Sequence, residues 1–333
     1  MKKLYICGLQ GHGKGLLRAL LDGHPSVISS GYFSLPGLSL LKDDFIDYIS
    51  KSNEILKIDS LYQSYNKNIQ VSLKINDKTL VVFPGRILKY IIINSDIDYH
   101  AIDYFINHRD SKNNKEYEFN ILLYLSKCAD ELKGNKYDSL ESLQEVFYYV
   151  FLENFCQSAD RKTMNDRYFL QIPFVNGFNS IEQISKKLID KKILIIDRNP
   201  ISSAFMNTER LVERDPRIIN RNEDLFDRLY FNQYDRILFS KQYVNKYKNF
   251  QEKLDSLLKQ NNKDIYVVDF DEMVLQPKQT MDKIASFLDI EVNPVLYKAT
   301  INGVPLVEPS SKGLQPGKIM HDPYKILNKK QIQ

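Results

Sequence analysis

The sequence is poor in cysteine, in long apolar runs and in net charge, and each shortage excludes a class of protein. Three cysteines, Cys7, Cys128 and Cys156, stand far apart in 333 residues and form no CxxC pair, so neither a disulfide framework nor a zinc site is indicated. No apolar run reaches the roughly 18 residues of a membrane helix, and the run before Gly8 is too short for a signal peptide. The net charge of +4 is too small to indicate nucleic acid as a partner. We therefore expect a cytoplasmic protein with no membrane span.

The composition that remains is that of a globular enzyme. Hydrophobic residues make up 43% and charged residues 26% of the chain, which excludes the disordered and fibrous classes. The length suffices to bury a full α/β core. Because no internal repeat or low-complexity segment interrupts the chain, we predict one α/β domain over residues 1–333.

The first 25 residues have the pattern of a strand, a glycine-rich loop and a helix. Residues 4–7 are apolar, residues 8–14 read GLQGHGK, and leucines then recur at helical spacing until Gly23 and Pro25. The loop satisfies GxxxxGK, the spacing in which backbone N–H groups converge on a phosphate beside the charge of a lysine. A plain turn joining strand to helix is the alternative.

One residue of the loop argues against a triphosphate-cleaving enzyme. Such enzymes carry Ser or Thr after the lysine, whose hydroxyl binds Mg²⁺, whereas this chain has Gly15. We therefore predict a phosphate site that requires no metal. Its predicted residues are Gly11, His12, Gly13, Lys14, Gly15 and Leu16.

Short runs rich in β-branched and aromatic residues alternate with helix-like segments. The runs are residues 27–30, 168–172, 193–197 and 265–270. This alternation predicts a parallel sheet flanked by helices. A last helix should begin at Pro277 and bury Met281, Ile284, Ala285 and Leu288. Beyond Pro294 we expect loop.

The block of residues 38–166 has a different character. Residues 69–75 and 79–83 predict a hairpin, while residues 117–132 and 140–155 have helical apolar periodicity. We interpret the block as a mostly helical insertion that caps the site. It carries no recognisable motif.

Residues 8–27, reading GLQGHGKGLLRALLDGHPSV, resemble the 5′-phosphosulfate loop and following helix of the sulfotransferases that use 3′-phosphoadenylyl sulfate (PAPS). The helix and its Leu-Asp-Gly-His-Pro ending match closely. The loop departs from the usual Ser-Gly-Thr-Thr form, because Gly11 stands in the place of a basic residue and His12 in that of Ser, with Lys14 and Gly15 in the places of the two Thr. The resemblance implies PAPS as donor and a hydroxyl acceptor.

Two later segments resemble the same family. Residues 193–200, ILIIDRNP, are similar to the strand whose final arginine binds the 3′-phosphate, which assigns that role to Arg198; an ion pair with Asp197 is the alternative. The family's serine eight residues later is Met206 here, so Asn207 is the candidate substitute, with Ser202 and Ser203 behind it. Residues 265–290 are similar to the family's late strand, turn, proline-started helix and Phe-Leu-Gly.

The tail and the catalytic groups are less marked. Lys312 and Gly313 lie where the family has a basic loop over the nucleotide, although a solvated basic loop is equally consistent. The family's catalytic Glu after His-Pro is missing, and Gln171 replaces its strand-end lysine. Lys14 for charge and His12 for proton transfer are therefore the catalytic candidates. His24 is interpreted as structural, and the base is left unassigned.

We therefore predict a PAPS-dependent sulfotransferase that acts on a hydroxyl group, with a glycan as one candidate acceptor. Two alternatives stay open. A P-loop kinase is favoured by GxxxxGK, with Asp269 and Asp271 imitating a metal-binding strand. A catalytically degenerate binding protein is favoured by the departures at Gly11, Gln171 and Met206.

Overall fold

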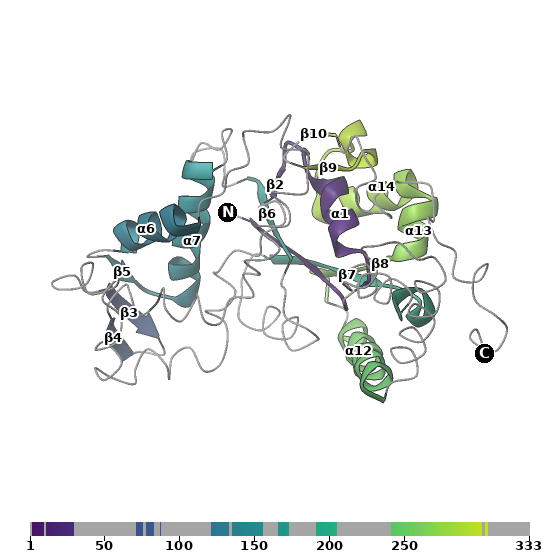
Figure 1. Cartoon of the computed structure of the whole chain (residues 1–333), viewed down its shortest axis with the longest axis horizontal. Helices are drawn as coiled ribbons and strands as arrows, with labels where there is room; N and C mark the ends of the chain where they lie inside the picture. The colour runs from purple at the N-terminus through teal and green to yellow at the C-terminus, as the bar shows by residue number, and fades with distance from the viewer. Residues whose placement is uncertain are drawn as a thin grey trace, which may run out of the picture. The chain divides into compact units, whose positions relative to one another are not determined.

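The protein is described by a computed structural model (Figure 1), which divides the chain into two compact units. Unit 1 comprises Met1, Tyr32–Arg167 and Gln183–Ile189, and unit 2 comprises Lys2–Gly31, Tyr168–Glu182 and Asp190–Gln333. The structure describes residues 2–9, 11–29, 71–75, 78–82, 87, 121–132, 135–155, 166–172, 191–204, 241–260, 262–301 and 304–305.

Unit 2 is built on a five-stranded parallel sheet, in the order β2-β6-β1-β7-β8 (Figure 1). The strands are β1 (Lys2–Cys7), β2 (Val27–Ser29), β6 (Tyr168–Gln171), β7 (Lys191–Asp197) and β8 (Ile265–Asp269). Leu4 of β1 pairs with Leu170 of β6 and Lys192 of β7, which makes β1 the central strand. The predicted parallel sheet is confirmed, and the four apolar runs predicted as strands correspond to β2, β6, β7 and β8. All carboxyl ends meet at one edge.

Helices flank this sheet on two sides. Helices α1 (Lys14–Leu21), α13 (Phe270–Leu275) and α14 (Pro277–Leu288) share one core with Leu4, Ile6 and Ile196 of the sheet. Helix α12 (Lys241–Lys259) lies on the opposite side (Figure 1) and buries Phe250, Leu254 and Leu257. The apolar residues of β1 and β7 are buried on both faces of the sheet, as expected when helices cover both faces.

Helix α14 follows the sequence prediction closely. Pro277 is its first residue, and all four residues of the predicted stripe, Met281, Ile284, Ala285 and Leu288, are fully buried. The helix ends at Asp289, whose φ of 54° and ψ of 49° are left-handed. The next segment is tied to the N-terminal turn, because His24 Nε2 lies 2.9 Å from the carbonyl oxygen of Glu291.

The segment beyond Pro294 is not simple loop, so that prediction was wrong. It contains a 3₁₀ helix (Pro294–Tyr297) and an antiparallel pair of strands, β9 (Thr300–Ile301) and β10 (Val304–Pro305). Two-residue strands are too short to produce an alternating pattern. A tertiary contact holds them instead: Thr300 Oγ1 lies 2.7 Å from the carbonyl oxygen of Asp22.

Unit 1 contains a three-stranded sheet, in the order β4-β3-β5, beside two helices. The predicted hairpin is confirmed by β3 (Val71–Ile75) and β4 (Lys78–Val82), which pair antiparallel. Helix α6 (Ile121–Leu132) lies within the predicted helical segment, whose first four residues are outside the described part of the chain. Helix α7 (Leu140–Phe155) has the predicted bounds, and β5 (Lys136–Tyr137) was not predicted. Ser139 starts α7 by accepting a hydrogen bond from the Ser142 N–H at 3.1 Å.

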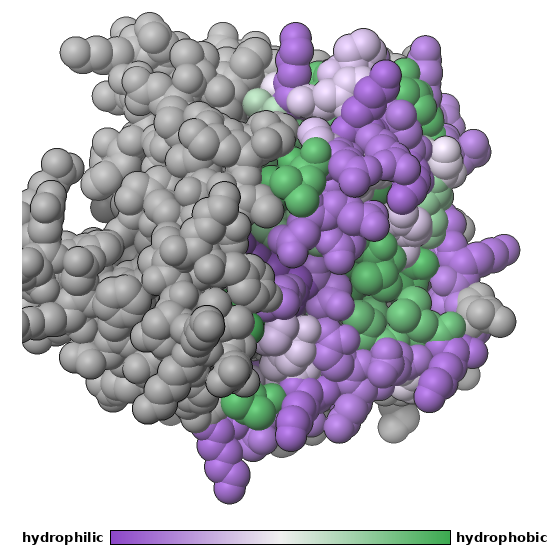
Figure 2. Space-filling model, turned by 90° about the vertical axis from the view of Figure 1, so that its right-hand side faces the viewer, coloured by the Kyte–Doolittle hydropathy of each residue, from purple (hydrophilic) through white to green (hydrophobic). Residues whose placement is uncertain are grey.

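No helix in the described part of the chain is long and apolar enough to cross a membrane. Figure 2 shows one face of the molecule, on which apolar side chains lie in groups among hydrophilic ones. The exposed large apolar residues are Val244, Leu258, Leu275 and Val292. Such exposed residues are ordinary on globular proteins.

Candidate nucleotide-binding site

The glycine-rich loop connects β1 to α1 at the carboxyl edge of the parallel sheet, which is where open α/β sheets bind ligands. Gly8, Gly11 and Gly13 have φ angles of 146°, 84° and 91°. A Cβ at Gly8 would lie 2.8 Å from the Ile196 carbonyl oxygen, and one at Gly13 only 2.2 Å from the Phe270 ring. The loop path therefore requires glycine both for its backbone angles and for its close contacts.

Lys14 holds its ammonium group over this loop. It is the first residue of α1, and its Nζ donates to the carbonyl oxygens of Gly8 at 2.6 Å and Leu9 at 3.2 Å. The positive end of the α1 dipole lies at the same place. Both features favour an anion at the start of the helix.

The next residues of α1 differ in how open they are. A Cβ added at Gly15 would meet no atom within 4 Å, so open space lies beside the first helical turn. Leu16, by contrast, has a buried side chain, and its N–H donates to the Gly13 carbonyl at 3.0 Å. Gly15 is thus the more accessible of the two predicted contacts.

His12 is fully buried beneath the loop. Its Nδ1 donates to the Ile196 carbonyl oxygen at 2.9 Å, while its ring makes an edge contact with Phe250 of α12 at 5.3 Å between centroids. Its Nε2 is also buried and has no hydrogen-bond partner among the described residues. Burial lowers the pKa of His12 to about 4, and the charges of Lys14 and Arg198 act in the same direction. His12 is therefore neutral at physiological pH.

Arg198, which directly follows β7, reaches the loop. Its Nη1 donates to the Gly11 carbonyl oxygen at 2.7 Å, and its Cζ lies 3.9 Å from the centre of the Phe270 ring. The carboxylate of Asp197 accepts a hydrogen bond from the backbone N–H of Arg198 at 2.9 Å. The guanidinium group is thus placed beside the loop.

Helix α12 supports the turn that carries Arg198. Gln251 Nε2 donates to Asp197 Oδ1 and to the Tyr247 hydroxyl, both at 2.9 Å. The Tyr243 hydroxyl donates to the Pro200 carbonyl oxygen at 2.8 Å. Sequence reasoning missed these residues because α12 has no motif. Its tyrosine and glutamine at i, i+4 and i+8 were the available signal.

The structure brings together Gly11, His12, Gly13, Lys14 and Arg198, which come from two segments of the chain more than 180 residues apart. Three predicted contacts, Asn207, Lys312 and Gly313, lie outside the described residues. Gln171, at the end of β6, is buried. Ser202 and Ser203 are buried within the helical residues 200–204.

Two groups near the loop are engaged in other ways. Asp269, which a kinase would need for its metal, caps α13 by accepting a hydrogen bond from the Glu272 N–H at 2.8 Å. Burial raises the pKa of Cys7 to about 12, so this thiol, at the end of β1, stays protonated. Asp269 thus serves as the helix cap, and the Cys7 thiol is not an activated nucleophile.

His24 has the contacts of a structural residue, as predicted. Its Nδ1 accepts a hydrogen bond from the Ser26 N–H at 3.0 Å, so the proton of the neutral ring is on Nε2, which donates to the Glu291 carbonyl oxygen. The ring thereby connects the turn after α1 to the segment after α14.

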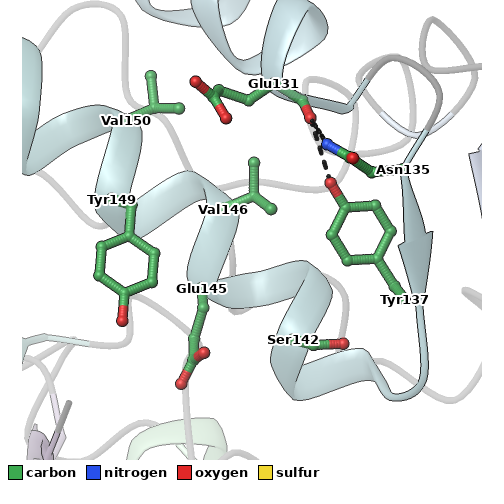
Figure 3. A pocket seen from close by; sticks show the side chains of 8 residues that line it. All are labelled: Glu131, Asn135, Tyr137, Ser142, Glu145, Val146, Tyr149 and Val150. Atoms are coloured by element: carbon green, nitrogen blue, oxygen red, sulfur yellow. Dashed lines mark hydrogen bonds between the residues drawn. The ribbon is translucent and has the colours of Figure 1, made fainter.

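Unit 1 has a separate hollow of about 220 Å³ between α6, β5 and α7 (Figure 3). Tyr137 and Asn135 both donate to the Glu131 carbonyl oxygen at one side of it, at 3.3 and 2.5 Å. Its lining residues are Glu131, Asn135, Tyr137, Ser142, Glu145, Val146, Tyr149 and Val150. The lining is a mixture of carboxylate, hydroxyl and apolar groups, and it contains none of the predicted site residues.

Several solved structures that the chain matches at low identity are sulfotransferases. The sulfotransferase domain of the Synechococcus PCC 7002 olefin synthase has 12% identity, with 97% of this chain and 84% of that chain covered and a TM-score of 0.43. A sulfotransferase from Alicyclobacillus acidocaldarius has 12% identity, coverage of 93% and 87%, and a TM-score of 0.40. A mouse sulfotransferase complexed with PAP has 12% identity, coverage of 63% and 76%, and a TM-score of 0.35.

The family is shown by comparison of the amino-acid sequence with protein-family models. No curated protein sequence matches the chain. A model of the sulfotransferase family, however, matches residues 103–294, which is more than half of the chain and includes β6, β7, β8 and Arg198. This chain therefore belongs to the sulfotransferase family.

Proposed function

We propose that this sulfotransferase family member binds PAPS at the loop after β1 and transfers its sulfuryl group to a hydroxyl acceptor. The observation that carries the proposal is the convergence of two cations on one glycine loop. Lys14 Nζ and Arg198 Nη1 both contact loop carbonyls, at Gly8 and Gly11, within 2.7 Å. The matched family segment begins at residue 103, so the role of the loop rests on its geometry.

The residues present fit such a donor. Open space beside Gly15 leaves room for a phosphosulfate group at the start of α1, where backbone N–H groups and the helix dipole favour negative charge. Lys14 would exchange its carbonyl partners for the anionic oxygens, and the planar fork of Arg198 would take the 3′-phosphate. When bound, PAPS supplies the activated sulfuryl group.

Transfer requires charge stabilisation and a base. As the acceptor oxygen bonds to sulfur, the bond from sulfur to the phosphate oxygen breaks, and Lys14 would stabilise the charge left on that phosphate. The acceptor hydroxyl must also lose its proton. The full burial of His12 and its pKa of about 4 make it a weak base and favour a positioning role for it. The base is still to be identified.

The setting of this activity is part of the same proposal. Cys7 and Cys128 are free and buried thiols, which suits a reducing compartment such as the cytoplasm. The acceptor would be a hydroxylated molecule, with a glycan as one candidate. Incubating the protein with radiolabelled donor and a cell extract, and then identifying the labelled product, would name its class.

Calorimetry can test donor binding directly. We expect 3′-phosphoadenosine 5′-phosphate (PAP) to bind without metal and ATP–Mg²⁺ to bind at least tenfold more weakly. Lys14→Ala and Arg198→Met should each weaken PAP binding by about tenfold or more, since each removes a charge-assisted contact. Lys278→Ala, which removes an exposed lysine of α14 whose Nζ lies over the Tyr297 ring, is the matched control and should leave binding unchanged.

Three results would contradict the proposed function or its site. Tighter binding of ATP–Mg²⁺ than of PAP would favour a kinase. PAP binding without sulfation of any hydroxylated acceptor would favour a binding protein. Unchanged affinity in both Lys14→Ala and Arg198→Met would place the donor away from the loop.

A further inference from the structure

The side chain of Phe270 lies under the guanidinium group of Arg198. Phe270 is the first residue of α13, directly after β8, and it belongs to the buried core of unit 2. The distance from Arg198 Cζ to the centre of its ring is 3.9 Å, well inside the roughly 6 Å range of a cation–π contact. A partly desolvated guanidinium benefits most from such a contact, and Arg198 is only 8% exposed.

The same ring also packs against the loop. A Cβ at Gly13 would lie 2.2 Å from Cε2 and 2.4 Å from Cδ2 of Phe270, so the ring is in direct contact with the Gly13 backbone. Gly13 is the N-cap residue of α1 and directly precedes Lys14. One aromatic ring therefore contacts both segments that form the site.

The position of the ring is set by the fold rather than by the ligand. Asp269 caps α13 at 2.8 Å, and β8 pairs with β7 up to Asp197 and Asp269, so Phe270 and Arg198 leave adjacent strands at the same level. Both side chains are then held against the end of β1. This geometry requires no ligand to form.

The contact also bears on how the guanidinium group meets other partners. A ring attracts a cation through its face, whereas the N–H groups of a guanidinium lie in its own plane. Phe270 therefore constrains the position of the cation, while one of its nitrogens, Nη1, donates to the Gly11 carbonyl oxygen at 2.7 Å. A phosphate at the edge of the plane would be met in the same way.

We propose that Phe270 is a positioning residue for the donor site: its ring holds the Arg198 guanidinium in the orientation that binds the anionic ligand and fills the space that a side chain at position 13 would need. This inference rests on the proposed function. It adds a residue whose chemical type, an apolar aromatic, would not itself contact a phosphate.

A double-mutant cycle in the full chain, with PAP affinity measured by calorimetry, tests the proposal. Phe270→Met keeps an apolar side chain of adaptable shape but removes the ring; we expect about tenfold weaker PAP binding, from the size of a buried cation–π contact. Phe270→Tyr keeps the ring and should bind PAP within about threefold of the wild type. In the Arg198→Met background, Phe270→Met should cause no further loss.

The double-mutant cycle distinguishes an effect of Phe270 on the orientation of Arg198 from an effect on the folding of the protein. If Phe270→Met weakens PAP binding equally with and without Arg198, the ring acts on the fold and the positioning role is overturned. Equal affinity of Phe270→Met and wild type overturns it as well. Failure of the wild type itself to bind PAP would instead remove the proposed function, and this inference with it. Thermal unfolding of each variant confirms that the folded protein is being compared.

Discussion

The hydrogen bond between His12 Nδ1 and the Ile196 carbonyl oxygen ties the loop after β1 to strand β7. A charged ring would have to be buried at this position beside Lys14 and Arg198, which is why the pKa of His12 falls from 6.5 to about 4. The native protein therefore keeps His12 neutral in a range of pH where the unfolded chain protonates it.

This difference predicts an acid-sensitive contribution to stability. Because the pKa of His12 is lower in the native protein, the unfolded chain gains a proton first as the pH falls. The free energy of unfolding is therefore unaffected by His12 above about pH 6.5 and decreases as the pH falls toward 4, by an amount on the order of 3 kcal/mol. His12→Asn keeps an N–H donor for Ile196 but cannot be protonated, so its free energy of unfolding should fall less over this range. Urea denaturation at several pH values measures the difference. Parallel pH profiles for the two proteins would contradict the prediction.

The residues of the loop show what a single sequence can and cannot reveal at this scale. The spacing of Gly8, Gly13 and Lys14 predicted a phosphate loop because backbone geometry restricts these positions to particular residue types. The ring of Phe270 could not be predicted, because an apolar residue after a strand has the same pattern whether it packs in the core or under an arginine.

Among the helices, α14 ends in an unusual way. Asp289 is exposed and adopts φ 54°, a left-handed conformation in which glycine is preferred, and its N–H bonds back to Ala285 and Ser286. The family resemblance has glycine after Phe-Leu at this place. The helix end is therefore formed here at some cost in backbone energy.

Asp289→Gly should accordingly stabilise the protein. We expect its free energy of unfolding to rise by about 0.5–1 kcal/mol, because glycine removes the steric cost of the left-handed angle and only part of the gain is lost to chain entropy. Asp289→Ala is the control and should not stabilise, since alanine keeps the Cβ. Chemical denaturation measures both. A less stable glycine variant would show that the Asp289 side chain stabilises this turn.

For the whole molecule, ligand binding and folding are linked. A ligand that binds only the folded state stabilises it by RT ln(1 + [L]/Kd), about 2.7 kcal/mol at 100 times Kd. We therefore expect PAP at that concentration to raise the free energy of unfolding of the wild type by this amount. The same PAP concentration should give a clearly smaller rise with Lys14→Ala, and chemical denaturation with and without PAP measures both. An equal rise in the variant would show that PAP binds elsewhere.

The architecture of unit 2 was largely predictable because it follows from local pattern. Buried parallel strands are continuous apolar runs, and residues 193–196 and 265–268 are such runs between helix-like segments. The prediction of one domain with an inserted block over residues 38–166 stays a prediction. The small strands β5, β9 and β10 escaped detection because pairs of residues have no period to detect.

The sequence by itself determined the chain positions of the five strands of the parallel sheet, of α1 and of α14, together with the glycine loop, because these depend on backbone angles and apolar periodicity. Only the tertiary structure decided that Arg198 reaches Gly11, that His12 is buried and neutral, and that Phe270 joins the loop to the arginine. Those facts depend on which strands are neighbours in the sheet, and strand neighbours separated by more than 180 residues leave no trace in the local pattern.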